Sequence, residues 1–329
     1  MGSLAGKCVL VTGGCGFVGS HIVDLLLKER CLRIVAVDNL VRGRRDNLAT
    51  ALAHPQVSFF EADIGDQALL QELVESSDIV FHQAALRITH CAADPGLAFD
   101  TMVKATFNLA ELCARFGIEK MIMASSASIY GTADTFPTTE RHHAYNDDTL
   151  YGVMKLFGEG VLRALAVPHV ALRYFNVYGP RMDIHGRYTE VLIRWMERIE
   201  AGLPPVIFGA GAQTMDFIDV RDVARANVLA AASECTTGAF NVASGVETSL
   251  LQLAAELAVA MDRPQLAPTL EPTRQVSAVR RRLADTGKAR AMLGFTAEIP
   301  IHEGLRDLVT WWRGALQSKS GPPESRVAT

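Results

Sequence analysis

A tyrosine and a lysine four positions apart could together carry acid-base chemistry. Tyr151 and Lys155 stand at the start of a predicted helix over 151–165, so both side chains share one helix face. An ammonium beside a phenol stabilises the phenolate, and we therefore expect Lys155 to lower the pKa of Tyr151 towards working pH. Ser126, near the end of the preceding predicted strand, could hydrogen-bond the same substrate oxygen and relay its proton.

A glycine-rich segment, VTGGCGFVGS (11–20), indicates where a dinucleotide could bind beside that pair. The segment follows a predicted strand and opens a predicted helix. Here Gly13 permits a tight turn, Gly16 lets the backbone approach a pyrophosphate, and Gly19 allows the helix to pack closely on the strand. The free N–H groups and positive dipole end of the helix then face the phosphates. An ordinary glycine turn would explain the loop if it stood alone.

Asp38, which ends the second predicted strand, strengthens the dinucleotide hypothesis. A carboxylate there hydrogen-bonds a ribose diol and repels a 2′-phosphate, which favours NAD over NADP. Asp63 ends the third predicted strand and could meet the adenine end. Arg42, Arg44 and Arg45 follow Asp38 and could soften the preference for NAD, but we expect them to form a solvated loop.

Alternating strand and helix patterns must position these groups. Apolar runs predict strands at 7–12, 33–38, 57–62, 78–84, 119–125 and 169–175, with helices at 17–29, 66–76, 99–116 and 151–165 between them. This alternation predicts an α/β fold with right-handed crossovers and a doubly wound parallel (Rossmann) sheet.

Beyond residue 180 the regular alternation of predicted strands and helices ends. The patterns predict helices at 188–201, 219–233, 248–261 and 301–316 and short strands near 205–208 and 239–243. We therefore predict a smaller C-terminal α/β substrate lobe beside the carboxyl edge of the sheet, where doubly wound folds bind ligands. The expected dinucleotide domain covers 1–178 and about 217–243, and the lobe covers about 179–216 and 244–317. The polar tail over 318–329 is expected to be disordered.

Composition narrows the class of protein further. The 329 residues are 49% hydrophobic and 21% charged, with a net charge of −4, which gives no broad cationic surface for nucleic acid. The six cysteines form no CxxC pair, and we expect reduced thiols in the cytoplasm. Neither a signal sequence nor an apolar stretch long enough to span a membrane is predicted.

Taken in order, the motifs resemble the extended short-chain dehydrogenase/reductases, specifically their nucleotide-sugar epimerases. The resemblance runs from about residue 5 to 315 and rests on TGGCGFVG, DN (38–39), DI (63–64), HQAA (82–85), SSASIYG (125–131), YGVMK (151–155) and LRYFNVYGPR (172–181). It implies that Ser126, Tyr151 and Lys155 are catalytic and that the cofactor is NAD. The residues that it implies for NAD are Gly13, Gly16, Phe17, Val18, Gly19, Asp38, Asn39, Asp63, Ile64, Ala84, Ala85, Tyr151, Lys155 and Phe175.

The same resemblance implies a site for a UDP-sugar. Asn176 would hold the diphosphate, Val206 and Phe208 would flank the uracil, and Arg282 with Asp285 would meet phosphate and ribose. Val206 and Phe208 could equally be core residues of a strand. For His142 and His143 no third ligand is spaced to make a metal site, so we expect none.

The segment SSASIYG discriminates between the reactions of the family. Relatives that eliminate water carry an acid and a base where this chain has Ala127 and Ser128, and uronate decarboxylases carry Glu where Ser128 stands. Epimerisation at C4 requires the fewest catalytic groups of these reactions. Tyr151 would take the C4 hydroxyl proton while the C4 hydride passes to NAD, and the resulting 4-keto sugar would rotate and receive the hydride on its other face.

Departures from the family pattern bear on the substrate. Met215 replaces an arginine that contacts the diphosphate in relatives, and Met102 replaces an asparagine near the nicotinamide. Arg87 follows HQAA in a loop that faces the hexose in relatives, and it could pair with a C6 carboxylate or bind the diphosphate. Arg187 is a second candidate for that carboxylate.

We therefore favour a UDP-glucuronate/UDP-galacturonate 4-epimerase, which resembles bacterial enzymes of that activity. The alternatives are a 4-epimerase of UDP-glucose or UDP-N-acetylglucosamine, a UDP-glucuronate decarboxylase, and an NAD-binding protein without catalysis. The helices predicted over 99–116 and 151–165 resemble the pair that forms a dimer interface in relatives, so a homodimer is expected.

Overall fold

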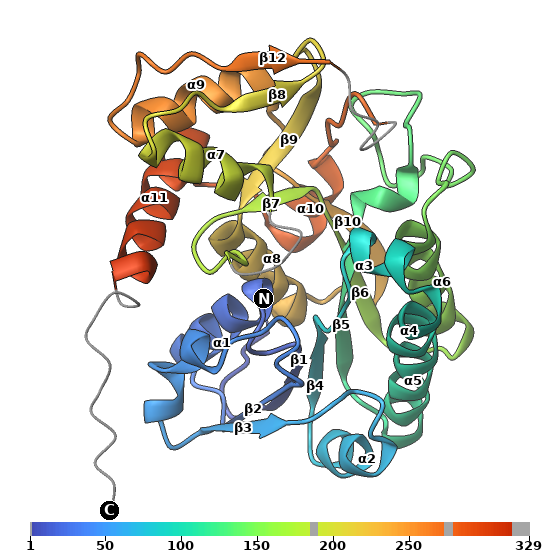
Figure 1. Ribbon diagram of the computed structural model, residues 1–329. Coiled ribbons are helices and arrows are strands. Elements are labelled where there is room, and N and C mark those ends of the chain that lie inside the picture. The colour runs from blue at the N-terminus through green and yellow to red at the C-terminus, as the bar shows by residue number, and fades with distance from the viewer. Residues whose placement is uncertain (1, 185–189, 273–278, 318–329) are drawn as a thin grey trace, which may run out of the picture.

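A seven-stranded parallel sheet forms the centre of the molecule. The computed structural model describes residues 2–184, 190–272 and 279–317, and the sheet order is β10-β6-β5-β4-β1-β2-β3 (Figure 1). Its strands are β1 (Cys8–Thr12), β2 (Arg33–Asp38), β3 (Val57–Glu61), β4 (Ile79–His82), β5 (Lys120–Ser126), β6 (His169–Tyr174) and β10 (Thr237–Val242). The predicted doubly wound α/β fold is confirmed.

Helices cover both faces of this sheet, as a parallel sheet with buried strands requires. One face packs against α1 (Phe17–Lys28), α8 (Val220–Ala232) and α10 (Gly287–Leu293). The other packs against α2 (Gln67–Glu75), α5 (Ala105–Phe116) and α6 (Leu150–Ala164). Every residue of β5 is buried, so this strand is fixed from both sides before its end reaches the surface of the cleft at Ser126.

The strand order reverses between β1 and β4, and this reversal locates the ligand crevice. Both neighbouring strands pair with the same residue of β1 near their ends, because Thr12 is the register partner of His82 in β4 and of Val37 in β2. His82 is buried and lies 2.8 Å from the Thr12 hydroxyl through Nδ1 and 3.1 Å from the Thr106 hydroxyl through Nε2. The loops that follow β1 and β4 therefore run in opposite directions from this point, and the crevice between them is where such folds bind ligands.

A second lobe sits above the carboxyl edge of the sheet (Figure 1). It contains α7 (Val191–Glu200), α9 (Leu250–Ala260) and α11 (Ile301–Gln317) around a core that includes Trp195 and Trp312. Its strands form two small sheets, one in the order β11-β9-β7 and one of β12 with β8. These strands are β7 (Asn176–Tyr178), β8 (Val206–Phe208), β9 (Thr214–Asp219), β11 (Glu247–Ser249) and β12 (Thr269–Glu271).

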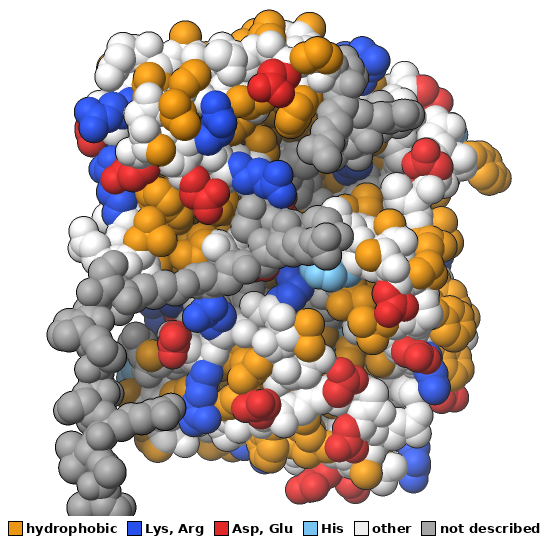
Figure 2. Space-filling model, in the orientation of Figure 1, with side chains coloured by type: hydrophobic (Ala, Val, Ile, Leu, Met, Phe, Trp, Pro, Cys, Tyr) orange, Lys and Arg blue, Asp and Glu red, His pale blue; other side chains and the backbone are white. Residues whose placement is uncertain are grey.

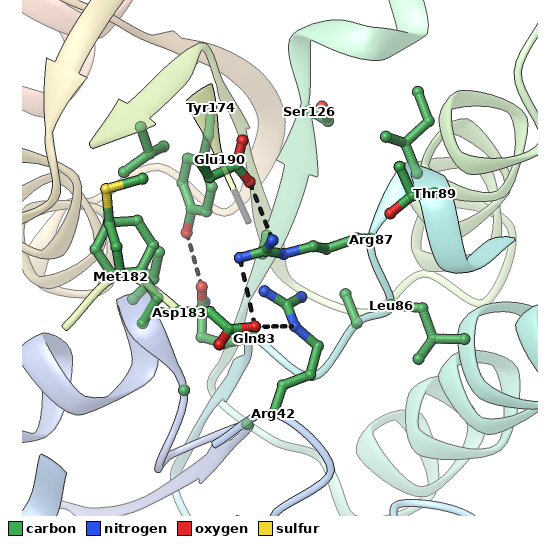
Figure 3. A pocket seen from close by; sticks show the side chains of 18 of the residues that line it. Arg42, Gln83, Leu86, Arg87, Thr89, Ser126, Tyr174, Met182, Asp183 and Glu190 are labelled. Atoms are coloured by element: carbon green, nitrogen blue, oxygen red, sulfur yellow. Dashed lines mark hydrogen bonds and ion pairs between the residues drawn. The ribbon is translucent and has the colours of Figure 1, made fainter. Parts of the chain in front are cut away.

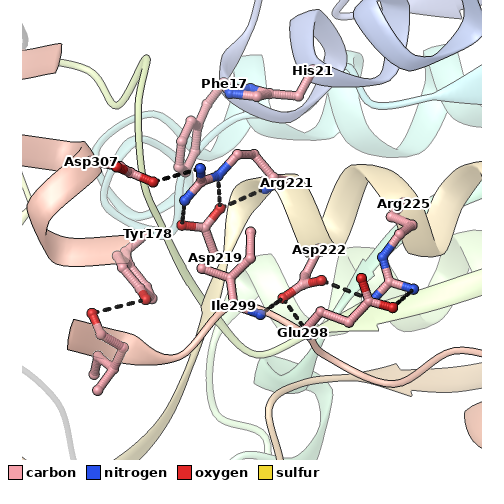
Figure 4. A network of polar contacts seen from close by, with 11 residues as sticks. Phe17, His21, Tyr178, Asp219, Arg221, Asp222, Arg225, Glu298, Ile299 and Asp307 are labelled. Carbon is pink, nitrogen blue, oxygen red and sulfur yellow. Dashed lines mark hydrogen bonds and ion pairs between the residues drawn. The ribbon is translucent and has the colours of Figure 1, made fainter. Parts of the chain in front are cut away.

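Two carboxylates at the start of α8 connect this lobe to the large sheet (Figure 4). Asp219 accepts two hydrogen bonds from the Arg221 guanidinium, whose Nη1 lies 2.7 Å from Asp307 Oδ2 on α11. Asp222 accepts the backbone N–H groups of Glu298 and Ile299, each at 2.9 Å, just before α11 begins. Because both aspartates are buried, these bonds hold α11 against the sheet domain.

Several elements differ from those predicted. The helix predicted over 219–233 begins at 220, because the unpredicted strand β9 ends at Asp219, whose side chain accepts the backbone N–H of Arg221 at the helix start. The helix predicted over 188–201 begins at 191 as α7, and residues 188 and 189 lie outside the described residues. Strands β7, β11 and β12 and helix α10 were likewise not predicted, because they are short and apolar periodicity cannot mark them.

The helix predicted over 99–116 is interrupted. It starts as α4 (Pro95–Phe99), widens into a π-helical turn, η3 (Asp100–Lys104), and continues as α5; the unpredicted α3 (Ile88–Ala93) precedes it. Short 3₁₀ turns, η1 (Arg45–Leu48), η2 (Ala51–Ala53) and η4 (Ala127–Tyr130), complete the elements described.

Three further expectations concern the chain as a whole. All six cysteines are free thiols. No helix in the described ranges has the length and apolar character that crossing a membrane requires. The tail over 318–329, expected to be disordered, lies outside the described residues.

Candidate active site

One cleft of about 2140 Å³ runs along the carboxyl edge of the sheet, beneath the second lobe. Figure 2 shows basic side chains on both sides of the hollow across the middle of the molecule. The cleft brings together most of the residues predicted for cofactor and substrate. These are Gly13, Gly16, Phe17, Val18, Gly19, Asp38, Asn39, Asp63, Ile64, Ala84, Ala85, Arg87, Ser126, Tyr151, Lys155, Phe175, Asn176, Phe208 and Arg282.

The glycine loop has no room for side chains where a pyrophosphate would lie. Gly13 has φ +68°, and a Cβ there would come within 2.7 Å of the Ala84 backbone nitrogen. A Cβ on Gly19 would come within 2.1 Å of the Gly13 carbonyl oxygen. Gly16 caps α1 without any side-chain hydrogen bond, so the first N–H groups of the helix stay directed at the cleft.

The adenosine end of the cleft is built from carboxylates held in place. Asp38 accepts the backbone N–H groups of Cys15 at 3.0 Å and Leu40 at 2.9 Å. Burial raises the pKa of the Asp38 carboxyl, while these two hydrogen bonds oppose the rise. The Asn39 side chain donates to Asp63 Oδ2 at 2.7 Å, which fixes these two predicted NAD-binding residues against each other.

Ser126, Tyr151 and Lys155 converge at the centre of the cleft. Ser126 ends β5, and α6 begins beside it, with Thr149 accepting the Gly152 N–H as its N-cap. Lys155 Nζ lies 5.7 Å from the centre of the Tyr151 ring and donates to the Ala124 carbonyl oxygen at 2.7 Å. The predicted shared helix face is therefore the face that meets the strand end.

The pKa of the phenol differs in direction from our expectation. Burial raises the pKa of Tyr151, and a hydrogen bond with Ser126 and the charges of Arg42 and Arg282 oppose the rise without outweighing it. Burial also lowers the pKa of Lys155 to about 8. The lysine bonds a backbone carbonyl, and its charge does not count among the main influences on the phenol, so the chain alone does not supply the expected lowering.

A buried polar network supports the strand that carries Ser126. Ser125 donates to Glu159 Oε1 at 2.6 Å, and Glu159 forms a bidentate pair with Arg173, with distances of 2.9 and 2.7 Å. Arg173 also donates to the Tyr130 hydroxyl, which in turn donates to Asn241 Oδ1. Such a fully paired network restricts the strand end to one geometry.

Met102 stands where the family resemblance implies an asparagine, and its thioether lacks the hydrogen-bonding groups of an amide. It is buried in the π-helical turn, where the Cys91 thiol lies 3.5 Å from its sulfur and the Tyr151 ring packs against the same cluster. The methionine thus places an apolar, polarisable surface against the cluster on which the Tyr151 ring packs.

Two arginines and two carboxylates meet in the part of the cleft shown in Figure 3. Arg87, at the N-cap of α3, lies 3.8 Å from Asp183 Oδ2 and 3.5 Å from Glu190 Oε1. Arg42 reaches the same carboxylate of Asp183 at 3.9 Å. The Arg87 side chain is 14% exposed, so its guanidinium lies in the cleft and not on the surface.

Arg42 was expected in a solvated loop, and that expectation is wrong. Burial and the neighbouring Arg87 lower its pKa to about 10, and its charge reaches Tyr151. Arg42, Asp183 and Glu190 were not predicted as site residues. They come from separate segments, and the only sequence signal was the run of arginines after Asp38.

The far end of the cleft contains groups suited to a phosphate ester. Asn176 Nδ2 is buried without a hydrogen-bond partner in the described part of the chain. Burial lowers the pKa of Arg282 to about 10, and Asp147 and Tyr151 oppose this effect. Met215 lines the cleft on β9, at the position where the family resemblance implies an arginine.

Two predicted substrate residues do not line the cleft in the described part of the chain, and the position of a third is not described. Val206 and Asp285 are absent from the described residues that line it: Val206 pairs with Thr269 in the small β8/β12 sheet, and the Asp285 carboxylate accepts the Gly287 N–H. Arg187 lies outside the described residues.

The cleft fits NAD. The loop excludes any Cβ at Gly13 and Gly19, a helix N-terminus faces it, and Asp38 ends the neighbouring strand, as a dinucleotide pyrophosphate and a ribose diol require. With Ser126, Tyr151 and Lys155 at its centre, the fold and site define an NAD-dependent enzyme of the extended short-chain dehydrogenase/reductase class.

Comparison with known proteins places the chain within that class. Residues 9–243 match the model of the "NAD dependent epimerase/dehydratase family", and the chain belongs to this family. It is 35% identical over 317 residues to a UDP-glucose 4-epimerase of Mycolicibacterium smegmatis, covering 94% of this chain and 99% of that one.

Two similar solved structures are also nucleotide-sugar epimerases. A UDP-N-acetylglucosamine 4-epimerase of Methanobrevibacter ruminantium, in complex with UDP-N-acetylmuramic acid, has 31% identity, a TM-score of 0.88 and coverage of 96% of this chain and 100% of that one. A UDP-glucose 4-epimerase of Thermus thermophilus, in complex with NAD, has 31% identity, a TM-score of 0.81 and coverage of 93% and 99%. The chain is an enzyme of this nucleotide-sugar 4-epimerase kind.

Proposed function

We propose that this enzyme interconverts UDP-glucuronate and UDP-galacturonate by inverting C4 of the sugar. The observation that carries the reaction is the convergence of Ser126, Tyr151 and Lys155 in one cleft with a dinucleotide loop. The observation that favours a uronic acid is the pair Arg87 and Arg42, directed into the same cleft.

The chain's own groups handle the proton of the C4 hydroxyl. NAD held by the glycine loop and Asp38 would supply the acceptor for the C4 hydride and the donor that returns it to the opposite face of the sugar. Ser126 hydrogen-bonds the C4 oxygen, and Tyr151 takes its proton as the carbonyl forms and gives it back after the sugar has turned. Because the chain alone leaves the pKa of Tyr151 raised, the Lys155 ammonium, 5.7 Å from the ring centre, and the positive charge of oxidised NAD would together stabilise the phenolate. No net redox change results.

Arg87 and Arg42 are proposed to recognise the C6 carboxylate. A guanidinium binds a carboxylate through two parallel hydrogen bonds, and a largely buried guanidinium does so with little competition from water. Glu190, whose side chain is 51% exposed, now lies near Arg87 and would turn to solvent as the substrate carboxylate enters. Asp183 would keep the two arginines from repelling each other.

The nucleotide is proposed to lie along the second lobe. Asn176 has a buried amide N–H group available for the diphosphate, and Arg282 supplies the positive charge that Met215 no longer gives. Phe208, partly exposed at the edge of β8, offers a surface for the uracil ring.

A 4-keto uronate is a β-keto acid and can lose carbon dioxide, so decarboxylation is the nearest competing reaction. The residues at 127 and 128 argue against it. Ala127 is buried and carries no acid or base, and Ser128, which lines the cleft, replaces the glutamate of decarboxylases. The alternatives with UDP-glucose or UDP-N-acetylglucosamine would leave Arg87 without a substrate carboxylate to bind.

A panel of substrates tests the proposal. Purified enzyme is incubated separately with UDP-glucuronate, UDP-glucose and UDP-N-acetylglucosamine, and C4 configuration is followed by NMR while released carbon dioxide is trapped. We expect UDP-galacturonate from the first substrate, at a kcat/KM well above that for the other two, with almost no carbon dioxide. Preference for a neutral sugar would contradict the uronate assignment, and carbon dioxide with a pentose product would indicate a decarboxylase.

We also propose a homodimer formed through α5 and α6. Large apolar side chains are exposed on and just before these helices: Leu97, Phe99, Phe107, Leu150, Val153 and Phe157. A second copy of the chain would cover them. Light scattering should give twice the chain mass for the wild type and a single chain mass for Phe157→Glu. A wild-type monomer would contradict this proposal.

A further inference from the structure

We propose that Asp134, His142 and His143 bind a zinc-type divalent ion in the loop between β5 and α6, outside the catalytic cleft. One carboxylate oxygen and one nitrogen from each imidazole all lie within 4.8 Å of one another. Sequence spacing offered no third ligand for the two histidines. The loop doubles back and brings Asp134 to them as a third potential ligand.

The hydrogen bonds of His142 leave a lone pair facing the carboxylate. Its Nδ1 lies 2.7 Å from the His143 carbonyl oxygen, which can only accept, so Nδ1 carries a proton. In the neutral ring Nε2 then has a lone pair, and this atom lies 2.8 Å from Asp134 Oδ1. Two acceptors at this distance need a cation between them, either an added proton or a metal ion.

The contacts around the two imidazoles show what a bound ion would replace. The backbone N–H of Asp134 approaches His142 Nε2 to 3.2 Å, so an ion on this nitrogen would displace that hydrogen bond. His143 Nε2 lies 3.2 Å from Asp134 Oδ2, so a second imidazole nitrogen reaches the same carboxylate. Ligand atoms about 3 Å apart are what metal–ligand bonds of about 2.0–2.2 Å produce.

The site is rigid on one side and open on the other. The His142 side chain is 2% exposed and packs edge-on against Tyr130, with ring centres 5.8 Å apart. His143 stacks on Tyr145 with ring centres 5.3 Å apart. Asp134 is 56% exposed, which gives an ion a path from solvent.

The donor set selects the kind of ion. Two imidazole nitrogens and one carboxylate oxygen suit zinc and similar transition ions, with water in the remaining position. Magnesium and calcium prefer oxygen ligands and would bind poorly here.

A bound ion would clamp a loop whose ends are already joined. Asn146 donates to the Thr132 carbonyl oxygen at 2.8 Å, so residues 132 and 146 close the loop. His142 packs on Tyr130, which belongs to the network that holds Arg173 and Glu159 behind β5. The ion would therefore stabilise the loop and its attachment to the strand that carries Ser126.

Metal titration of the full-length enzyme tests the proposal. After treatment with EDTA and dialysis, the protein is titrated with zinc chloride by calorimetry and with cobalt(II) by visible absorption. We expect one ion per chain and ligand-field bands of a nitrogen-oxygen site. Asp134→Asn and His143→Ala alter partly exposed side chains and should weaken zinc binding by at least about tenfold. His54→Ala, at an exposed histidine elsewhere, should bind like the wild type.

Circular dichroism and epimerisation rate verify that each variant is folded. Failure of the wild type to bind one zinc ion per chain would overturn the proposal. Wild-type affinity in both Asp134→Asn and His143→Ala would also overturn it, because the ion would then lie elsewhere. Equal affinity for magnesium and zinc would contradict the assignment of imidazole ligands.

Discussion

At the scale of single residues, the proposed mechanism makes the activity of Tyr151 depend on the charge of Lys155. Its ammonium is buried and bonds one backbone carbonyl, and burial lowers its pKa to about 8. In the proposed mechanism its protonated form helps to stabilise the phenolate, whereas its neutral form cannot. The lysine is therefore closer to losing its charge than an exposed lysine, whose pKa is about 10.4.

The pH dependence of the rate follows from this. Because the active form of Lys155 is the ammonium, kcat should fall as pH rises through about 8. Lys155→Met should lower kcat by roughly a thousandfold and remove that descending limb. Initial rates of C4 inversion are measured over roughly two pH units on each side of that pKa. A rate that stays constant to the top of that range would contradict the role of the lysine.

Arg87 should determine preference for a uronate. Arg87→Ala should lower kcat/KM for UDP-glucuronate by about a hundredfold, or roughly 3 kcal/mol, because a buried charge pair is lost. It should leave kcat/KM for UDP-glucose nearly unchanged. Arg263→Ala, at an exposed arginine away from the cleft, is the control. Equal losses for both sugars would instead place Arg87 at the diphosphate.

Glu190→Gln gives a matched test in the opposite direction. Glu190 lies 3.5 Å from Arg87, so in the proposed complex it would compete with the substrate carboxylate. Removing its charge should lower KM for UDP-glucuronate by roughly threefold to tenfold and should not change KM for UDP-glucose. A raised KM for UDP-glucuronate would show that Glu190 supports the bound sugar.

At the scale of elements, the start of α1 controls cofactor binding. A Cβ on Gly19 would meet the Gly13 carbonyl oxygen at 2.1 Å, and the backbone cannot give way there without opening the turn. The turn at Gly13 and the N-terminus of α1 therefore pack so closely that only glycine fits at position 19.

Gly19→Ala should therefore purify with little NAD. Gly160→Ala in α6 is the matched control, because its Cβ would meet only the tip of Arg163, at 3.9 Å. That control should keep its NAD and gain up to about 1 kcal/mol in the free energy of unfolding. Cofactor content by absorbance after denaturation is the measurement. Full NAD content in Gly19→Ala would refute the role given to the loop.

A comparison of the predicted and observed elements shows how much of the fold the sequence could predict. Long apolar periods are enough to predict the main helices and the central strands, and the spacing of Tyr151 and Lys155 on α6 is enough to identify their shared face. Strand β9 escapes prediction because Asp219 ends it and caps the next helix without a loop. Arg42 and Arg87 could not be paired from sequence, because only the fold brings the loops after β2 and β4 together around Asp183.

At the scale of the whole molecule, the cleft exists because two lobes are held at a fixed separation. Asp222 is buried and accepts two backbone N–H groups that precede α11, as Figure 4 shows. Arg225 pairs with the same carboxylate at 2.9 Å. This carboxylate fixes the C-terminal helix, whose Trp311 and Gly314 line the cleft.

Asp222→Ala should lower the free energy of unfolding by about 3 kcal/mol, because two N–H groups and an arginine lose their acceptor. It should also raise KM for the UDP-sugar more than it changes kcat. Glu298→Ala removes the exposed partner of Arg225 and should cost less than about 1 kcal/mol. Urea unfolding of both variants tests this. An equal loss of unfolding free energy in the two variants would show that the buried Asp222 carboxylate does not hold the lobes together.

The central claim is that Tyr151 removes the C4 hydroxyl proton while the C4 hydride stays within the enzyme. The direct measurement uses UDP-glucuronate labelled with deuterium at C4 and follows the label by NMR. We expect UDP-galacturonate that retains deuterium at C4, with no exchange into water, and almost no turnover by Tyr151→Phe. Loss of the label to solvent, or full activity of Tyr151→Phe, would contradict the account.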